Sequence, residues 1–309
     1  GRMGTRLRLP ATRGFASATT TGKNMAPNSP NVVTDPNVAT DEECSEYYNN
    51  ASHYDVLWGK DNIHIGYYPH LVNKTALHLD FQQAAVALTE RMITLGDITH
   101  KSRVLDLGCG KGISCAQIAE STGAECVGVD LSPGNIERAS AMALSRPDLR
   151  LSFAEGSFTA LQEELCRGEF THLIAQESFC HAHAALPTIF ENVKAALAPG
   201  GLAVINDYLG ADVEVSDTTQ RNVHDRLGFG ELLGHVAWRR CAESSGLEIL
   251  HYENLNRHMA HGYSQLAEVA AQYDFCSADG TPLEEGYAYS SAAATNREIG
   301  LNLAVLSVL

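Results

Sequence analysis

The stretch Val104-Leu-Asp-Leu-Gly-Cys-Gly-Lys-Gly112 decides the fold of this chain. An apolar run ends in an acid, Asp106, and three glycines follow at alternate positions. Further along, a second apolar run, Cys126-Val-Gly-Val129, ends in Asp130. This order is typical of a strand, a tight glycine turn, a helix and a second parallel strand that closes with a carboxylate. It predicts a site for a cofactor that contains adenosine.

The glycine spacing indicates which cofactor. Nicotinamide and flavin sites read G-x-G-x-x-G because a pyrophosphate sits on the helix N-terminus. Here Gly108, Gly110 and Gly112 read G-x-G-x-G, and Asp106 beside the turn would repel a pyrophosphate. The pattern suits S-adenosylmethionine (SAM), which carries an ammonium and a sulfonium but no phosphate. We expect Asp106 to approach its methionyl end and Asp130 to bind its ribose hydroxyls.

Strands and helices alternate through the rest of the chain. Apolar runs predict further strands at 151–154, 170–175, 202–205, 247–250 and 301–306. Helical periodicity predicts helices at 75–95, 187–197, 226–245 and 264–272, and Ser132 reads as a helix N-cap before Pro133. In the 226–245 helix, the expected core face is Phe229, Leu232, Leu233, Val236 and Ala237. The alternation predicts a doubly wound, mostly parallel α/β sheet of seven strands.

Ligands bind such sheets at the carboxyl ends of the strands. Five polar residues are predicted to lie there: Asp106, Asp130, Gln176, Glu177 and Asp207. The loop 155–158 is expected beside the adenine. The complete set of predicted cofactor contacts is Asp106, Gly108, Gly110, Gly112, Asp130, Leu131, Asn135, Gly156, Ser157, Phe158 and Gln176.

These motifs resemble the class I SAM-dependent methyltransferases, and the flanking sequence narrows the resemblance. Residues 47–54 and 56–68, with a Tyr pair, Trp-Gly and Ile-His-Ile-Gly-Tyr, look like the N-terminal lid of the sarcosine/dimethylglycine, tocopherol and plant amine methyltransferases. Residues 176–181 and 261–264 look closest to the sarcosine/dimethylglycine group. The resemblance covers about residue 46 to the C-terminus. It implies a Rossmann-like fold with a helical lid, within one domain at 38–309.

One departure concerns the acceptor pocket. Members of this family often carry Asp-Pro after the fifth strand, whereas this chain has Asp207-Tyr208. Moreover, about fifty residues separate the last two strands, where a bare fold needs only a short hairpin. The excess, about 254–298, is expected to form an inserted helical cap that shapes the pocket for the methyl acceptor.

The resemblance implies methyl transfer to a small molecule, first to the amine of a glycine-derived compound of the sarcosine/dimethylglycine type. An amine must lose its proton before attack, and His181 and His64 are the candidates to accept it. Acceptor contacts are expected from Tyr47, Trp58, Tyr67, Asp207 and Tyr208, although the aromatic residues suit a lid core equally well. Arg226, Arg239 and Arg257 are candidates to bind an acceptor carboxylate.

Other functions stay open at this point. A prenylated phenol or quinone methylated at carbon, or a thiol, is the alternative acceptor. A scaffold without activity is a third possibility, which the intact Asp106, Gly108, Gly110 and Asp130 argue against. Arsenic methylation would require paired cysteines, and none of the eight forms C-x-x-C or a zinc-type spacing. No metal site is therefore predicted.

Charge is distributed unevenly along the 309 residues, of which 44% are hydrophobic. The first 34 residues contain no acid and five basic residues, so the remainder has 17 basic against 37 acidic residues, a net charge of −20. The negative charge of residues 35–309 disfavours their binding to nucleic acid or to an anionic membrane. No apolar run approaches the roughly 20 residues of a membrane span.

The N-terminal segment 1–37 is rich in Arg, Ser, Thr and Ala. This composition is typical of a transit peptide, with 13–17 as the expected processing region. A mitochondrial location is the first expectation, with a plastid or the cytoplasm as alternatives. A disordered tail is the competing interpretation.

Overall fold

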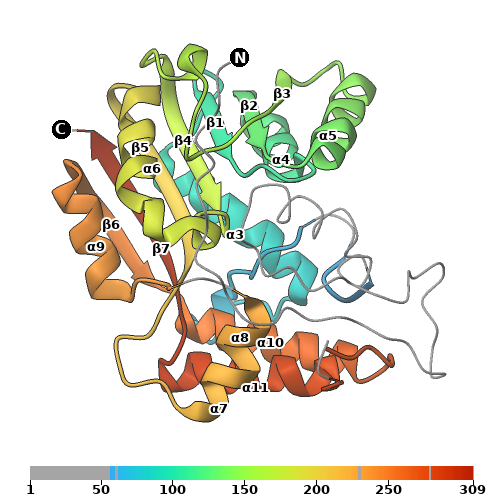
Figure 1. Ribbon diagram of the computed structural model, residues 1–309. Helices are drawn as coiled ribbons and strands as arrows, with labels where there is room; N and C mark the ends of the chain where they lie inside the picture. Colours follow the sequence, from blue (N-terminus) through green and yellow to red (C-terminus); the bar gives the residue numbers. More distant parts are fainter. Residues whose placement is uncertain (1–55, 60–61, 229–230, 278–279, 309) are drawn as a thin grey trace, which may run out of the picture.

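The computed structural model describes residues 56–59, 62–228, 231–277 and 280–308. The expected transit peptide at 1–37 and the expected acceptor contact Tyr47 lie outside the described residues. A seven-stranded sheet forms the centre of the molecule, in the order β3-β2-β1-β4-β5-β7-β6 (Figure 1). The strands are β1 (Arg103–Leu107), β2 (Glu125–Asp130), β3 (Leu151–Glu155), β4 (Phe170–Gln176), β5 (Leu197–Leu209), β6 (Leu247–Asn254) and β7 (Gly300–Val308).

Strands β1 to β5 pair in parallel, and β7 inserts antiparallel between β5 and β6. The order reverses beside β1, because the chain passes from β1 outward to β3 and then returns to β4 on the other side. Such a reversal opens a crevice at the carboxyl ends of the central strands. The fold class predicted from the sequence, a doubly wound, mostly parallel α/β sheet of seven strands, is confirmed.

Helices cover both faces of the sheet (Figure 1). On one face lie α3 (Phe81–Gly96), α4 (Ile113–Thr122) and α5 (Pro133–Ser145), and on the other lie α6 (Leu186–Ala196) and α9 (His235–Ser244). Each face has its own apolar core: Leu88 packs with Val104 in the first, and Phe190 with Trp238 in the second. In the described part of the chain, no helix has the length and apolar character needed to cross a bilayer.

A second helical layer lies beyond the sheet edge, at the bottom of Figure 1. It contains α10 (Asn256–Ala270) and α11 (Leu283–Asn296), which stand between β6 and β7, together with α7 (Asp217–Thr219), the π-helical turn Gln220–His224 and α8 (Asp225–Leu227). Three 3-10 turns complete the described structure, at Pro69–Leu71, Glu163–Leu165 and Phe179–Ala185. Helices therefore occupy the segment expected to be a cap, although α10 begins at Asn256 rather than at residue 264.

Two helices are shorter in the structure than the sequence predicts. The helix expected at 75–95 begins at Phe81, because Asp80 caps it and accepts a 2.8 Å hydrogen bond from the Gln83 N–H. The helix expected at 226–245 is wrong: α8 ends at Leu227, before Gly228 with its φ of 62°, and α9 starts only at His235. Val236, predicted to face the core, is 52% exposed, and Trp238 is buried in its place.

The fifth strand is longer in the structure than the sequence predicts. It was predicted at 202–205, with Asp207 beyond its end, but β5 continues to Leu209. The reason is tertiary, because β7 pairs with β5 through Leu209↔Gly300, a partner about ninety residues away. The prediction that Asp207 lies at a strand end is therefore wrong.

Candidate functional site

The glycine turn after β1 depends on backbone conformations that favour glycine. Gly108, Gly110 and Gly112 have φ values of 81°, 53° and 79°. The N–H groups of Gly108 and Cys109 both donate to the Val129 carbonyl, at 2.8 and 3.0 Å, which ties the turn to β2. A Cβ at Gly108 would stand 2.4 Å from that of Ser178, whereas a Cβ at Gly110 would meet nothing within 4 Å. The turn is thus packed on one side and open at Gly110.

Asp130 holds the next part of the site together. Its Oδ2 accepts from the Gly110 N–H at 2.9 Å, and its Oδ1 accepts from the Ser132 N–H at 2.9 Å and from Asn135 Nδ2 at 3.2 Å. Ser132 caps α5 as predicted, with Pro133 in the first turn. A carboxylate offers about four lone-pair directions. Three are occupied here, which fixes the carboxylate and leaves capacity for a ligand hydroxyl.

Asp106 is a buried carboxyl group, with 2% of the residue exposed. Burial raises its pKa to about 7; the nearby charge of Asp130 raises it further, and the hydrogen bond from the Cys115 thiol opposes the rise. Gln176 adds a second acceptor, because its buried Oε1 has no partner among the described residues while its Nε2 donates to Thr89 at 3.2 Å. A cationic donor in this cavity would satisfy both groups.

A cavity of about 150 Å³ lies over these groups. Ten of the sequence-predicted residues line it: His64, Asp106, Gly108, Gly110, Asp130, Leu131, Asn135, Phe158, Gln176 and His181. The structure therefore brings the two catalytic candidates and most of the predicted cofactor contacts into one place. His64 comes from the lid, whose described residues are 56–59 and 62–68. The lid lies far from the other cavity residues in the sequence.

Three predicted cofactor contacts do not line the cavity. Gly112 is the residue before α4, and a Cβ there would lie 2.6 Å from the Phe153 ring. Gly156 donates its N–H to the Asp130 carbonyl at 3.0 Å, and the Ser157 hydroxyl bonds that of Thr159 at 2.8 Å. These residues shape the loops around the cavity.

The aromatic acceptor candidates form a core between lid and cap. Trp58 is buried, meets Phe81 edge-on, and donates its indole N–H to the Tyr287 hydroxyl at 2.9 Å. The hydroxyls of Tyr208 and Tyr263 hydrogen-bond at 2.7 Å. Separately, Tyr67 stacks on the ring of His258 at 4.5 Å. None of Trp58, Tyr67 and Tyr208 lines the described cavity, so the lid-core interpretation describes them.

The arginine candidates also lie elsewhere. Arg226 donates to Ser290 Oγ at 2.6 Å, Arg239 lies over the Tyr252 ring, and Arg257 is exposed. Among the lysines and arginines of the described residues, only Lys111 lines the cavity. An acceptor carboxylate in the cavity would therefore meet Lys111.

Both histidines that the sequence offers as catalytic candidates are electrically neutral at neutral pH. Burial lowers the pKa of His64 and of His181 to about 4. For His64, the carbonyl of Ile65 raises the pKa again in part; for His181, nearby His183 lowers it further. Since Nδ1 of His64 lies 3.0 Å from the Ile65 carbonyl, this nitrogen carries the proton and Nε2 is left as an acceptor. A neutral imidazole has a lone pair that can accept a proton, but a pKa of about 4 makes it a weak base near neutral pH.

Glu177, which the sequence predicts at a strand end, is a cavity residue that the sequence pattern does not single out. Its side chain lines the cavity, and its Oε1 accepts from the Ile65 N–H of the lid at 2.8 Å. Its backbone has a φ of 51°, which is uncommon for a residue other than glycine. Burial raises the pKa of Glu177 well above its usual value, and the nearby charge of Asp207 adds to this. An acid following the fourth strand was the available signal.

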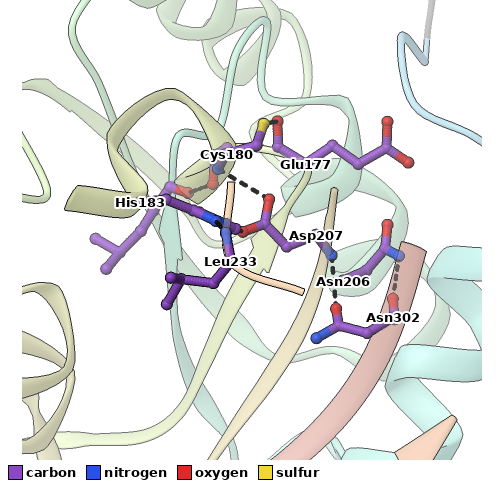
Figure 2. A network of polar contacts seen from close by, with 9 residues as sticks. Glu177, Cys180, His183, Asn206, Asp207, Leu233 and Asn302 are labelled. Atoms are coloured by element: carbon purple, nitrogen blue, oxygen red, sulfur yellow. Dashed lines mark hydrogen bonds and ion pairs between the residues drawn. The ribbon is translucent and has the colours of Figure 1, made fainter. Parts of the chain in front are cut away.

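Asp207, expected to contact the acceptor, is instead buried beneath the segment that follows β4. Figure 2 shows it pointing toward His183 and Cys180. Its Oδ2 lies 3.0 Å from His183 Nε2, and its Oδ1 accepts from the Cys180 N–H at 3.0 Å. It does not line the cavity.

Comparisons with known proteins agree with this geometry. A family model described as a methyltransferase domain matches residues 104–201. Tocopherol O-methyltransferase of Arabidopsis thaliana is 28% identical over 195 residues, which cover 59% of this chain and 55% of that protein. Glycine/sarcosine/dimethylglycine N-methyltransferase of Actinopolyspora halophila is 24% identical over 258 residues, covering 77% and 43%. The chain thus spans about half the length of these relatives.

Solved structures show the same fold. The structure of a putative sarcosine dimethylglycine methyltransferase from Galdieria sulphuraria has a TM-score of 0.68 at 18% identity, over 83% of this chain and 97% of that one. Geranyl diphosphate C-methyltransferase from Streptomyces coelicolor has a TM-score of 0.67 at 18% identity, over 87% and 97%. The family match and the relatives show a methyltransferase domain within this chain, and the solved structures share its fold.

Proposed function

We propose that this chain binds SAM and transfers its methyl group to the nitrogen of a small amine. The observation that carries the choice of acceptor is Glu177, a buried carboxyl group at the cavity that forms no ion pair with a lysine or arginine among the described residues. With Asp106 and Asp130 it makes the lining acidic, which favours a cationic acceptor over an anionic one. An ammonium group would enter with its charge and leave its proton on Glu177.

The residues of the cavity fit the cofactor. Asp130 would hold the ribose hydroxyls, and Asp106 with the unpartnered Gln176 Oε1 would hold the cationic methionyl end. Gly110 lets the backbone approach the ligand without a side chain in the way. When bound, SAM supplies a methyl group already activated on a sulfonium.

The protein has to align the acceptor, exclude water and remove a proton. The lid contributes to all three, because Ile65 anchors it on Glu177 and His64 closes over the cavity. The raised pKa of Glu177 makes its carboxylate a stronger base than an exposed glutamate. His181 lines the same cavity, and its lowered pKa leaves Glu177 as the stronger base of the two.

A glycine-derived amine, as in sarcosine or dimethylglycine, is the first member of the proposed class, with its carboxylate toward Lys111. The second candidate is a phenol or quinone with an apolar tail, which one structural feature favours. Trp58, Phe81, Tyr263 and Tyr287 form an aromatic cluster that joins the lid and α3 to the cap helices α10 and α11. Opening of this cluster would expose a surface suited to an apolar acceptor.

Transfer of labelled methyl from SAM separates these candidates. The panel contains sarcosine, dimethylglycine, an amine of the same size without a carboxylate, a tocopherol precursor and a thiol. Methylation of the amines supports the proposal, and a preference for those with a carboxylate that Lys111→Ala removes supports the glycine-derived class. Methylation of the precursor or of the thiol alone would replace the proposal. SAM binding without any transfer would indicate a scaffold.

The affinity for SAM is expected to rise with pH. Asp106 has a pKa of about 7, so it is mostly protonated near about pH 6 and mostly ionised near about pH 7.5, and a cation prefers the ionised form. Affinity should increase about five- to tenfold across this range. Calorimetry in two buffers of different ionisation enthalpy should show proton release on binding. Asp106→Asn should abolish most of the pH dependence; a wild-type affinity independent of pH would contradict this role.

A further inference from the structure

The segment that follows β4, residues 177–185, contains both Glu177 and His181. It is held to β5 by a buried pair, His183 of this segment and Asp207 of β5. The His183 side chain is 1% exposed and that of Asp207 0%. Asp207 Oδ1 accepts from the Cys180 N–H, and the Cys180 thiol donates to the Glu177 carbonyl at 3.3 Å (Figure 2). These contacts fasten the middle of the segment to β5.

The hydrogen bonds fix the tautomer of His183. Its Nδ1 lies 2.9 Å from the Leu233 N–H, which can only donate, so Nδ1 is an acceptor. The ring proton therefore sits on Nε2 and is donated to Asp207 at 3.0 Å. One imidazole thus joins three pieces of chain: its own segment, β5 and the loop before α9.

Asp207 is itself anchored to the neighbouring strand. Its N–H donates to Asn302 Oδ1 at 3.0 Å, and the neighbouring Asn206 donates its side-chain amide to the Asn302 carbonyl at 2.5 Å. The Asn206 carbonyl in turn accepts from the Glu177 N–H at 2.7 Å. The first residue of the segment is therefore held by the same strand pair as its middle.

We propose that His183 and Asp207 are positioning residues that hold Glu177 and His181 in the geometry required for the acceptor reaction. The assignment rests on the proposed function of the cavity. It replaces the expectation that Asp207 contacts the acceptor directly. Glu177 occupies an unfavourable backbone conformation with a φ of 51°, and such a conformation persists only where its surroundings fix it.

His183→Ala should lower kcat on the order of 10- to 100-fold with little change in SAM affinity, since small displacements of reacting groups have effects of this size. His183→Gln offers one donor and one acceptor, toward Asp207 and Leu233, and should recover part of kcat. His251→Gln is the matched control, because His251 pairs with Glu253 at the surface, away from the cavity. A folded His183→Ala variant with wild-type kcat would overturn the proposal.

Asp207→Asn adds a readout that a purely structural role would not move. Titratable groups close to Glu177 are Cys180 in its own segment, and Asp207 and Tyr208 on β5. The other titratable groups that line the cavity with it are His64, Asp106, Cys109, Lys111, Asp130 and His181. Removing the charge of Asp207 lowers the pKa of Glu177, so the acid limb of the pH–rate profile should move to lower pH. His183→Gln keeps that charge and should leave the limb in place. A limb that stays in place in Asp207→Asn would contradict the proposal.

The proposal can fail separately from the proposed function. If the wild type methylates no acceptor on the panel, the proposed function fails, and the hydrogen-bond arrangement is then tested in the SAM complex. Nitrogen chemical shifts of His183 should show a neutral ring protonated on Nε2. The Leu233 amide should exchange with solvent faster in His183→Ala than in the wild type. The other tautomer, or unchanged exchange, would overturn the arrangement itself.

Discussion

Glu177→Gln is expected to lower kcat by about 10²- to 10⁴-fold, the range that a positioned general base contributes. The substitution keeps the size of the side chain and an oxygen that can accept from the Ile65 N–H, so the lid anchor is preserved while the basicity is lost. SAM affinity should change little. Steady-state kinetics with the best acceptor of the panel measures the first effect, and calorimetry measures the second.

The pH profile makes this test specific. Because the pKa of Glu177 is raised, its proton-accepting form disappears as pH falls through that raised value, and the wild-type rate should fall with it. His64 and His181, with pKa values of about 4, remain neutral over the same range. Glu177→Gln should lack this acid limb. Glu164→Gln, at an exposed acid on the 3-10 turn Glu163–Leu165, is the control. A Glu177→Gln variant with normal kcat would remove Glu177 from the chemistry.

Asp130→Ala is expected to weaken SAM binding by about 1–3 kcal/mol, through the loss of charge-assisted hydrogen bonds to the ribose. This corresponds to about a 5- to 150-fold higher Kd. The carboxylate also orders its surroundings, because it accepts from Gly110, Ser132 and Asn135, so the glycine turn should loosen as well. Calorimetric titration with SAM and with its demethylated product measures the change.

Two further variants isolate the cause. Asp130→Asn keeps an oxygen acceptor but removes the charge, and its affinity should fall between those of the wild type and Asp130→Ala. Asp148→Ala, which breaks an exposed ion pair with Arg146, should leave the affinity unchanged. If folded Asp130→Ala bound SAM as tightly as the wild type, or if the wild type preferred NADH, the cofactor assignment would be untenable.

The parts of the site that the sequence predicts well depend on local chemistry. The glycine turn requires left-handed backbone at Gly108 and Gly112, and a strand-end acid such as Asp130 is read from the apolar run before it. Ser132 at a helix N-terminus is equally local. None of these features needs information from distant parts of the chain.

The parts that the sequence did not predict depend on distant contacts. Asp207 lies inside β5 because β7 extends the pairing there, so no local turn signal could mark its place. The Glu177 side chain is held at the cavity by a hydrogen bond from the lid residue Ile65, which is 112 positions away in the sequence. Trp58 joins a cluster with Tyr287, 229 positions away, so periodicity alone could not separate a core role from acceptor contact.

The hydrogen bond between Ile65 and Glu177 has a consequence for the order of events in a turnover. A carboxylate accepts an N–H bond more strongly than the neutral acid does. Uptake of the acceptor's proton by Glu177 would therefore weaken the hydrogen bond that holds the lid over the cavity. Because the acceptor loses its proton before the methyl group moves, the lid would be held less tightly from that step until Glu177 loses the proton again. Amide exchange at Ile65, slow while Glu177 is ionised and faster once it is protonated, would record this timing.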